Sequence, residues 1–161
     1  MQAVMEITFR EFRSGDEDAF RTLNEQWISK YFALEEKDML TLRQPQKYIL
    51  APGGHIYFAL LDEEIVGCCA LIATEPGAYE VAKMAVSEEH RNRGIGKSML
   101  AHIVESAKSL GARKLVLETN SKLKNAIHVY ESLGFEHLDP SQVEPSPYKR
   151  ADVFMELVIV K

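Results

Sequence analysis

The chain has 161 residues, a length typical of one compact domain, and we expect residues 1–161 to form a single one. Hydrophobic residues make up 46% and charged residues 27% of the chain, which excludes a disordered protein. The formal net charge of −5 argues against nucleic acid as the partner, and no apolar run reaches the ~18–20 residues that span a bilayer. The first ten residues lack the pattern of a secretory signal, so we expect a cytoplasmic protein.

The first half of the chain predicts a strand, two helices and a hairpin. Residues 5–13 alternate apolar and polar side chains, as a half-buried strand does. Apolar residues then recur at helical spacing to about residue 30, and a short helix is expected at 35–42, before Pro45. After a turn, two apolar runs at 56–61 and 65–73 fit an antiparallel hairpin.

The second half alternates strands with helices. Residues 79–86 form a strand, a charged glycine-containing loop follows at 87–98, and an amphipathic helix then runs to Gly111. The remaining elements are, in order, strand 114–119, helix 125–133, strand 135–138 and strand 151–160. The order β-α-α-β-β-β-α-β-α-β-β predicts an α/β fold with a mixed sheet, helices on its faces and some parallel pairing.

The glycine-containing loop does not match two common phosphate-binding motifs. A Walker-type loop ending at Gly96 needs a glycine where Arg91 stands. A dinucleotide-binding fingerprint beginning at Gly94 needs a third glycine where Met99 stands.

A simpler interpretation of the same loop is an anion site. Glycines let the backbone turn tightly, so that consecutive N–H groups and the N-terminus of the next helix can point at one anion. Arg91, Arg93 and Lys97 add positive charge around it. The segment therefore predicts a pyrophosphate site, and the alternative is that Gly94 and Gly96 only shape the turn before the helix.

Two segments together resemble the GNAT superfamily of N-acetyltransferases. Residues 91–96 (RNRGIG) are similar to the Gln/Arg-x-x-Gly-x-Gly/Ala loop of that family, and residues 129–135 (VYESLGF) resemble its late Tyr-x-x-x-Gly-Phe segment. The resemblance is carried mainly by residues 81–135. It implies a GNAT fold in which strands 79–86 and 114–119 begin paired and then splay into a V, and it implies acetyl-CoA as the acyl donor.

The resemblance also implies the residues that would bind acetyl-CoA. Backbone groups of Met84, Ala85 and Val86 would hydrogen-bond the pantetheine arm. The loop amides would hold the pyrophosphate, and they belong to Arg91, Asn92, Arg93, Gly94, Ile95, Gly96 and Lys97. Many relatives have an asparagine where Leu123 stands, and Asn120 and Asn125 are the nearby candidates to replace it. Asn125 could instead cap the last helix.

Direct transfer to an amine needs two proton steps. A primary amine has a pKa near ~10 and arrives mostly as ammonium, so a base must remove its proton. Glu80, placed like the catalytic glutamate of the histone-acetylating branch, is the expected base, and Glu118 on the facing strand is its rival. Tyr130 stands where family members carry the tyrosine that protonates the departing thiolate; the alternative is a core aromatic.

The acceptor, a small molecule or a peptide, should enter past the first two helices and the last hairpin. Trp27 and Tyr31 could line that entrance, and Tyr148 and Arg150 could hold a carboxylate through the bidentate guanidinium. The second pair would favour an amino-acid-like acceptor, and the acidic net charge leaves cationic acceptors open.

Several other features point to no further chemistry. The histidines show no metal-ligand spacing, so no metal is expected. Cys68 and Cys69 are adjacent in an apolar run, where we expect buried thiols that pack and do not react. A non-catalytic acyl-CoA-binding or regulatory module of the same fold is the alternative function, and a nucleotide-dependent kinase is disfavoured by Arg91. The sequence leaves open whether two subunits pair into a homodimer.

Overall fold

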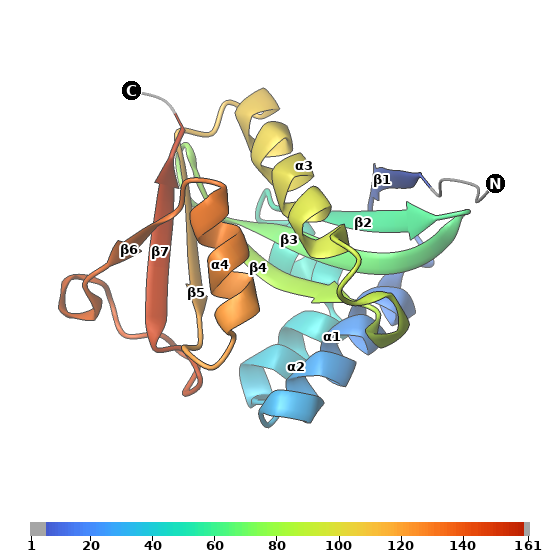
Figure 1. Cartoon of the computed structure of the whole chain (residues 1–161), viewed down its shortest axis with the longest axis horizontal. Helices are drawn as coiled ribbons and strands as arrows, with labels where there is room; N and C mark the ends of the chain where they lie inside the picture. The colour runs from blue at the N-terminus through green and yellow to red at the C-terminus, as the bar shows by residue number, and fades with distance from the viewer. Residues whose placement is uncertain (1–5, 160–161) are drawn as a thin grey trace.

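A seven-stranded mixed sheet organises the chain, in the strand order β1-β2-β3-β4-β5-β7-β6 (Figure 1). The structure is a computed structural model that describes residues 6–159. Its strands are β1 (Ile7–Glu11), β2 (His55–Leu61), β3 (Glu64–Glu75), β4 (Ala78–Val86), β5 (Lys114–Thr119), β6 (Glu136–Leu138) and β7 (Val153–Val158). Only β4 and β5 pair in parallel among the described strands, as expected when an α-helix connects two neighbouring strands.

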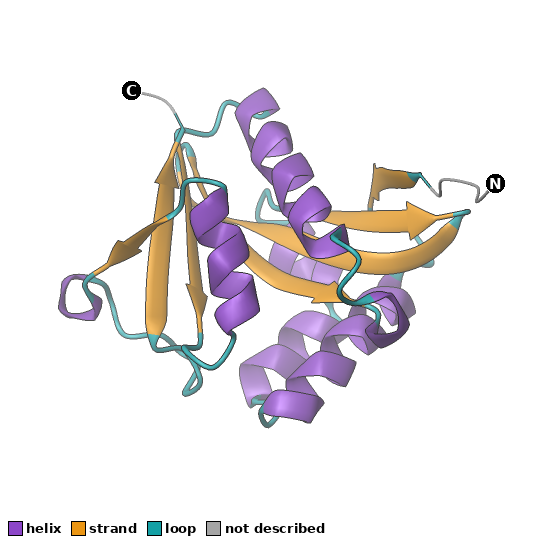
Figure 2. Cartoon of the chain, viewed as in Figure 1, coloured by secondary structure: helices purple, strands orange, loops and turns teal. Residues whose placement is uncertain are grey.

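Helices cover both faces of the sheet (Figure 2). The α-helices are α1 (Glu17–Tyr31), α2 (Glu36–Arg43), α3 (Ile95–Ser109) and α4 (Lys124–Ser132). Residues of α3 and α4 share a buried apolar cluster with one face of the sheet, and residues of α1 and α2 share a second cluster with the other face. The mixed α/β fold predicted from the element order is therefore confirmed.

The predicted elements are all present, with shifted ends and short additions. Three short helical turns were not predicted: η1 (Gln46–Leu50), η2 (Glu88–His90) and η3 (Pro140–Gln142). The first of them forms after Pro45 because Ile49 is fully buried against the cluster under α1 and α2. Met5 and Val160, which the sequence placed in the first and last strands, lie outside the described residues.

Two predicted details, the end of the helix before Gly111 and the burial of the two cysteines, are confirmed. Gly111 follows the last residues of α3 with a φ of +83°, the left-handed conformation that ends many helices. Cys68 and Cys69 are fully buried and unpaired by any disulfide. Burial raises the pKa of the Cys68 thiol to about 12, so this thiol stays protonated and unreactive at neutral pH.

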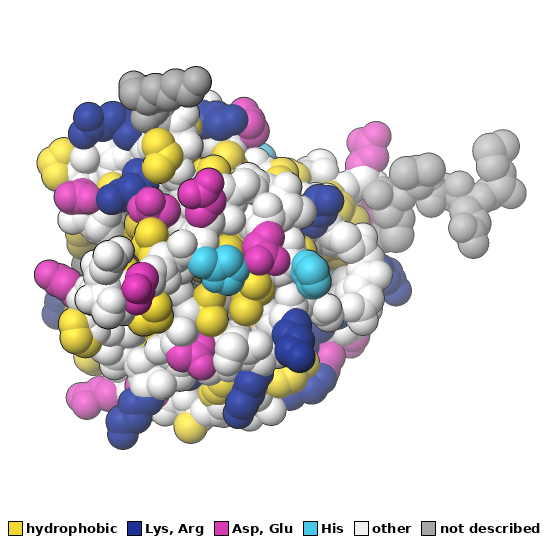
Figure 3. All heavy atoms as spheres, turned by 60° about the vertical axis from the view of Figure 1, so that its left-hand side comes forward, with side chains coloured by type: hydrophobic (Ala, Val, Ile, Leu, Met, Phe, Trp, Pro, Cys, Tyr) yellow, Lys and Arg dark blue, Asp and Glu magenta, His cyan; other side chains and the backbone are white. Residues whose placement is uncertain are grey.

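The face that carries β6, β7 and α4 shows no large area of one charge. Acidic and basic side chains are interspersed there among hydrophobic ones (Figure 3).

Candidate active site

The two central parallel strands separate halfway along their length. Pairing between β4 and β5 ends at Glu80 and Val116, after which β4 continues to Val86 and β5 to Thr119 without further pairing between them. The divergence is visible in Figure 1, where β4 and β5 leave their common end in different directions. The predicted V is therefore present. A cleft of about 730 Å³ opens at this place.

A bulge in β4 changes the direction of the strand beside the cleft. The register with β3 shifts between Cys68, opposite Ala85, and Ala70, opposite Ala82. Lys83 lies inside this irregular segment with a φ of +53°, unusual for a residue with a side chain. A bulge of this kind leaves backbone groups outside the ladder and re-aims side chains. Met84, Ala85 and Val86 follow it and line the cleft.

The loop between β4 and α3 presents a row of backbone N–H groups. Asn92 and Gly94 both have left-handed backbone conformations, with φ of +64° and +79°. Among the described residues, no acceptor is present for the N–H groups of residues 92–97, whereas Ser98 N donates to Gly94 O and resumes the helical pattern. Alternating backbone conformations before a helix N-terminus create a concave anion site, and here it adjoins the cleft.

The cations predicted around this loop have different positions. Lys97 lines the cleft and is exposed. Arg91 also lines it, and its Nε donates to Val86 O at 3.4 Å while its guanidinium lies 6.0 Å from the Tyr31 ring centre. Arg93 is exposed and is not among the residues that line the cleft. Of the three cations predicted around the loop, Arg91 and Lys97 therefore line the cleft.

Two carboxylates lie where the strands separate. Glu80 is the last β4 residue paired with β5, and Glu118 lies two residues beyond the Val116 that opposes it, so both side chains share one face of the sheet and line the cleft. Burial, and then repulsion from Glu118, raise the pKa of Glu80 to about 7, although Lys37 and Lys83 act in the opposite direction. Glu118 Oε1 accepts a hydrogen bond from Ser146 Oγ at 2.7 Å.

Tyr130 approaches the cleft from α4, across the sheet from these carboxylates. It belongs to the buried cluster under α3 and packs at 6.0 Å from the Phe135 ring, yet it also lines the cleft. Burial raises the pKa of Tyr130, so its hydroxyl keeps its proton well above neutral pH. The two possibilities considered from the sequence, a core aromatic and a cleft residue, are combined in one side chain.

The two predicted asparagines differ in how free their side chains are. Asn120 Nδ2 donates to Arg150 O at 2.6 Å, and its Oδ1 accepts from Lys122 N at 2.8 Å. Asn125 is exposed, and its amide has no hydrogen-bond partner among the described residues. It does not cap α4, because the helix begins at Lys124 with Leu123 at the cap position. Both asparagines line the cleft.

Aromatic side chains of α1 form one wall of the opening. Trp27 and Tyr31 line the cleft, and Trp27 Nε1 donates to Asn24 Oδ1 at 3.3 Å. Tyr31 is 49% exposed, more than expected for a residue that only fills the core. The predicted entrance residues therefore lie together, with Phe32 set edge-on to Trp27.

Arg150 does not have the free guanidinium that the sequence suggested. Its two terminal nitrogens make a bidentate contact with the Asp38 carboxylate, at 2.7 and 2.6 Å. Asp38 is fully buried and also accepts from Lys83 Nζ at 2.6 Å. The predicted use of Arg150 as the fork for an acceptor carboxylate is corrected accordingly, since a carboxylate of the protein itself already fills that fork.

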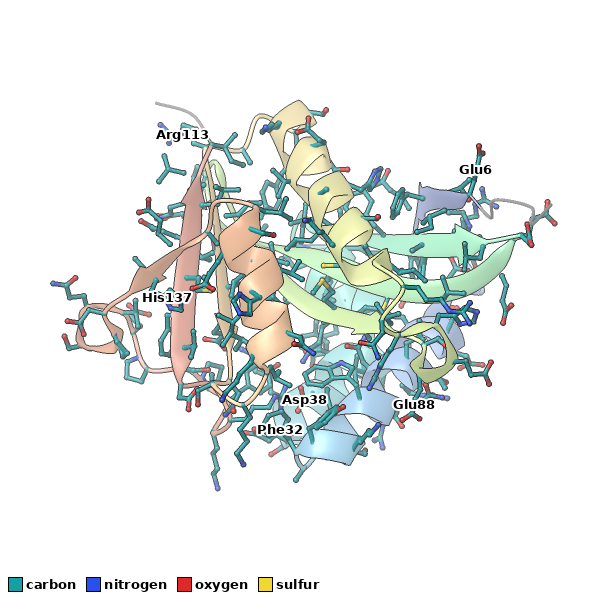
Figure 4. The ribbon with its side chains drawn as sticks, in the orientation of Figure 1. Glu6, Phe32, Asp38, Glu88, Arg113 and His137 are labelled. Atoms are coloured by element: carbon teal, nitrogen blue, oxygen red, sulfur yellow. The ribbon has the colours of Figure 1, made fainter. Side chains whose placement is uncertain are left out.

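Asp38 and Lys83 are the residues that sequence reasoning missed. Figure 4 labels Asp38 on the α2 side of the cleft. Burial alone would raise the pKa of Asp38, but hydrogen bonds and charge from Arg150 and Lys83 lower this pKa to about 2. Tyr148 completes the group, since its hydroxyl oxygen accepts from Lys83 Nζ at 3.1 Å and its ring lies 4.5 Å from the Arg150 guanidinium. In the sequence, the one signal for this group of residues was the charged Lys83 in the middle of an otherwise mostly apolar stretch of β4.

Two features are absent from residues 6–159. No group of histidine, cysteine, aspartate and glutamate side chains there is arranged to hold a metal ion. None of the helices in this part of the chain combines the length and the apolar character needed to cross a membrane.

Splayed parallel strands, a loop with free N–H groups and a cleft beside them are the features expected of an acyltransferase, and comparison with known proteins gives the family. A model of the acetyltransferase (GNAT) family matches residues 1–135, so the chain belongs to that family. Relatives include the uncharacterized N-acetyltransferases YsnE and YvbK of Bacillus subtilis. YsnE is 36% identical over 116 residues, covering 66% of this chain and 77% of YsnE. YvbK is 31% identical over 101 residues, covering 61% of this chain and 65% of YvbK.

Human N-acetylaspartate synthetase is 34% identical over 97 residues, which cover 60% of this chain and 32% of that protein. The chain thus matches only part of the length of several relatives.

Solved structures show the same fold at low sequence identity. A GNAT-family acetyltransferase from Staphylococcus aureus superposes with a TM-score of 0.83 at 20% identity, covering 94% of this chain and 98% of that one. The structure of yncA from Salmonella typhimurium was determined with its cofactor acetyl-CoA. It superposes with a TM-score of 0.73 at 18% identity, covering 97% of this chain and 95% of that one.

Proposed function

We propose that residues 1–161 act as one acetyltransferase domain that moves an acetyl group from acetyl-CoA to a primary amine by direct attack in a ternary complex. The observation that carries this proposal is the row of N–H groups at residues 92–97, which have no acceptor within residues 6–159 and lie at the edge of a cleft that Glu80 and Tyr130 also line. Six consecutive donors beside a helix N-terminus fit a diphosphate, and so support acetyl-CoA as the donor.

The strands would direct the rest of the donor toward the carboxylates. Beyond Glu80 the cleft-facing edge of β4 is not paired with β5, so backbone groups of Met84, Ala85 and Val86 are placed to bind the amides of a pantetheine arm. Asn125, with its free amide, is the better candidate of the two asparagines for a side-chain contact with that arm.

Glu80 would act as the general base. A carboxylate with a pKa of about 7 is a stronger base than an ordinary glutamate and is still about half ionised at neutral pH. Glu80 takes one proton from the acceptor ammonium, and the nitrogen lone pair then forms the N–C bond to the thioester carbonyl. The C–S bond breaks, and its electron pair leaves on the CoA sulfur.

Tyr130 would donate its hydroxyl proton to that sulfur. Since burial keeps the phenol protonated, its O–H can hydrogen-bond the developing thiolate throughout the neutral range. After the attack the nitrogen loses a second proton. This proton balances the one that Tyr130 has given to the sulfur. The products are the N-acetylated amine and free CoA.

Donor binding and turnover can be tested separately. Acetyl-CoA at 100 times its dissociation constant should raise the free energy of unfolding by about 2.7 kcal/mol, measured by urea or thermal denaturation. Release of free CoA should then depend on an added amine from a panel of amino acids, polyamines, aminoglycosides and peptides. Absence of both effects would refute the proposal, and stabilisation without amine-dependent release would indicate a non-catalytic acyl-CoA-binding module.

A further inference from the structure

The acceptor end of the cleft holds two cations that are already neutralised. Asp38 accepts four hydrogen bonds, from Lys83 Nζ, from both terminal nitrogens of Arg150 and from Glu35 N at 2.9 Å. The Glu35 carboxylate adds a further contact to Arg150 at 3.3 Å. Two positive and two negative formal charges therefore cancel within this group.

These cations are also poorly accessible to a ligand. The side chain of Lys83 is 5% exposed and that of Arg150 is 14% exposed. Every lone-pair direction of the Asp38 carboxylate is in use, so an acceptor carboxylate could reach Lys83 or Arg150 only by displacing a buried ion pair. Breaking such a pair is costly because a charge is left without a partner in a low-dielectric place.

The two carboxylates on the neighbouring strands have no such compensation. Among the described residues, neither Glu80 nor Glu118 forms an ion pair. The charged groups that act on Glu80 are Glu118, Lys37 and Lys83, and of these Lys83 is held by Asp38. Lys37 is exposed and lies outside the cleft, 5.6 Å from the Tyr148 ring centre, where solvent screens its charge.

Glu80 and Glu118 thus add negative charge to this end of the cleft that no ion pair offsets among the described residues. The hydrogen bond from Ser146 holds one Glu118 oxygen and leaves the other available. Glu80 and Glu118 are offset by one strand spacing and two residues, which places their backbones about 8 Å or more apart. Two cationic groups separated by a short aliphatic chain match this arrangement.

We propose that the acceptor is a diamine or longer polyamine, with Glu80 meeting the reacting nitrogen and Glu118 binding a second ammonium group, and that acceptors with a carboxylate in that position are disfavoured. This inference rests on the proposed acetyltransferase function and narrows its substrate class. It makes Glu118 a specificity-determining residue, a different role from the rival base considered in the sequence.

Three matched amines test the inference: 1,4-diaminobutane, butylamine and 4-aminobutanoate share one four-carbon chain and differ in the distal group. Their binding to the CoA-loaded protein is measured by calorimetry, which needs no turnover, and kcat/KM is measured from CoA release. We expect the diamine to bind at least about tenfold more tightly than butylamine, and 4-aminobutanoate to bind more weakly than butylamine.

Substitution of Glu118 tests whether this residue causes the expected order of affinities for the three amines. Glu118→Gln should reduce the preference for the diamine over butylamine to about threefold or less, whereas Glu144→Gln, an exposed glutamate in the loop between β6 and β7, should preserve it. Asp38→Asn, where it folds, should improve binding of 4-aminobutanoate, because Lys83 and Arg150 are then not fully neutralised.

Tight binding of 4-aminobutanoate by the wild-type protein, or an unchanged preference in Glu118→Gln, would overturn the inference. Failure of the proposed function looks different: the amines would bind in the expected order, but no acetyl transfer to any of them would occur.

Discussion

The Glu80→Gln substitution should have opposite effects on activity and on stability. Activity should fall because the base is lost, and the free energy of unfolding should rise because a buried charge is lost. Burial, together with repulsion from Glu118, raises the pKa of Glu80 from 4.5 to about 7. Between these two values the folded protein holds a proton that the unfolded chain releases. The free energy of unfolding of the wild type should therefore decrease as the pH rises from about 4.5 to 7.

The size of this effect follows from the same two values. A tenfold change in acidity is worth about 1.4 kcal/mol, which gives an upper limit of about 3 kcal/mol. Glu80 is half-buried, and solvent screening reduces the effect, so we expect about 1–3 kcal/mol. Glutamine keeps the shape of the side chain but does not titrate, so Glu80→Gln should be more stable than the wild type by this amount at pH 8 and about equally stable at pH 4.5.

Urea denaturation of both proteins at the two pH values measures the difference directly. The same substitution should lower kcat/KM by about 10²–10⁴-fold and remove the increase of the wild-type rate as the pH rises through 7. Glu64→Gln, an exposed glutamate at the start of β3, is the matched control and should change neither quantity. Equal stability of Glu80→Gln and the wild type at pH 8 would show that Glu80 is not held in a destabilising environment, and the argument for its raised pKa would then be wrong.

Four further substitutions test other parts of the site. Tyr130→Phe should lower kcat more than it weakens acetyl-CoA binding, measured by steady-state kinetics beside calorimetry, and unchanged turnover with chemistry rate-limiting would remove Tyr130 from the mechanism. Gly94→Ala and Gly111→Ala both place a side chain at positive φ, +79° and +83°, with no atom within 4 Å of the new Cβ. Both should therefore cost about 1–2 kcal/mol in urea denaturation, but only the first should weaken acetyl-CoA binding; equal binding by both variants would contradict the anion site. Asp38→Ala should lower the free energy of unfolding by about 3–5 kcal/mol because two buried cations lose their partner, and a loss below 1 kcal/mol would show that the ion group is not structurally coupled.

The conformation of the loop that we propose to bind an anion could be predicted from the sequence because its determinants are local. Gly94 and Gly96 lie between a strand and an amphipathic helix, and the structure places the helix start at Ile95 with Gly94 in the left-handed conformation. Backbone conformation, helix start and free N–H groups all depend on residues within a few positions of one another. The same holds for the stop at Gly111 and for the strand at 114–119, which coincides with β5.

Local sequence patterns predicted the structure less reliably where a side chain had alternative partners. Asn125 has the residue type of a helix cap, but α4 starts one residue earlier, so its amide faces the cleft without a partner. The segment after Pro45 has no strong helical periodicity, and it forms the turn η1 because burial of Ile49 stabilises it. Burial in the tertiary structure thus explains the turn η1, and the start of α4 differs from the predicted start by one residue.

The sequence by itself determined the order of the elements, the glycine-containing turn before α3 and the resemblance to a family of acetyltransferases. Only the tertiary structure decided the electrostatics of the acceptor end. Asp38 meets Lys83 across 45 positions of sequence and Arg150 across 112, and this contact turns a predicted carboxylate-binding fork into an internal ion pair. Charges interact through space, over a few ångströms, and the distance along the chain carries no information about which of them the fold will bring together.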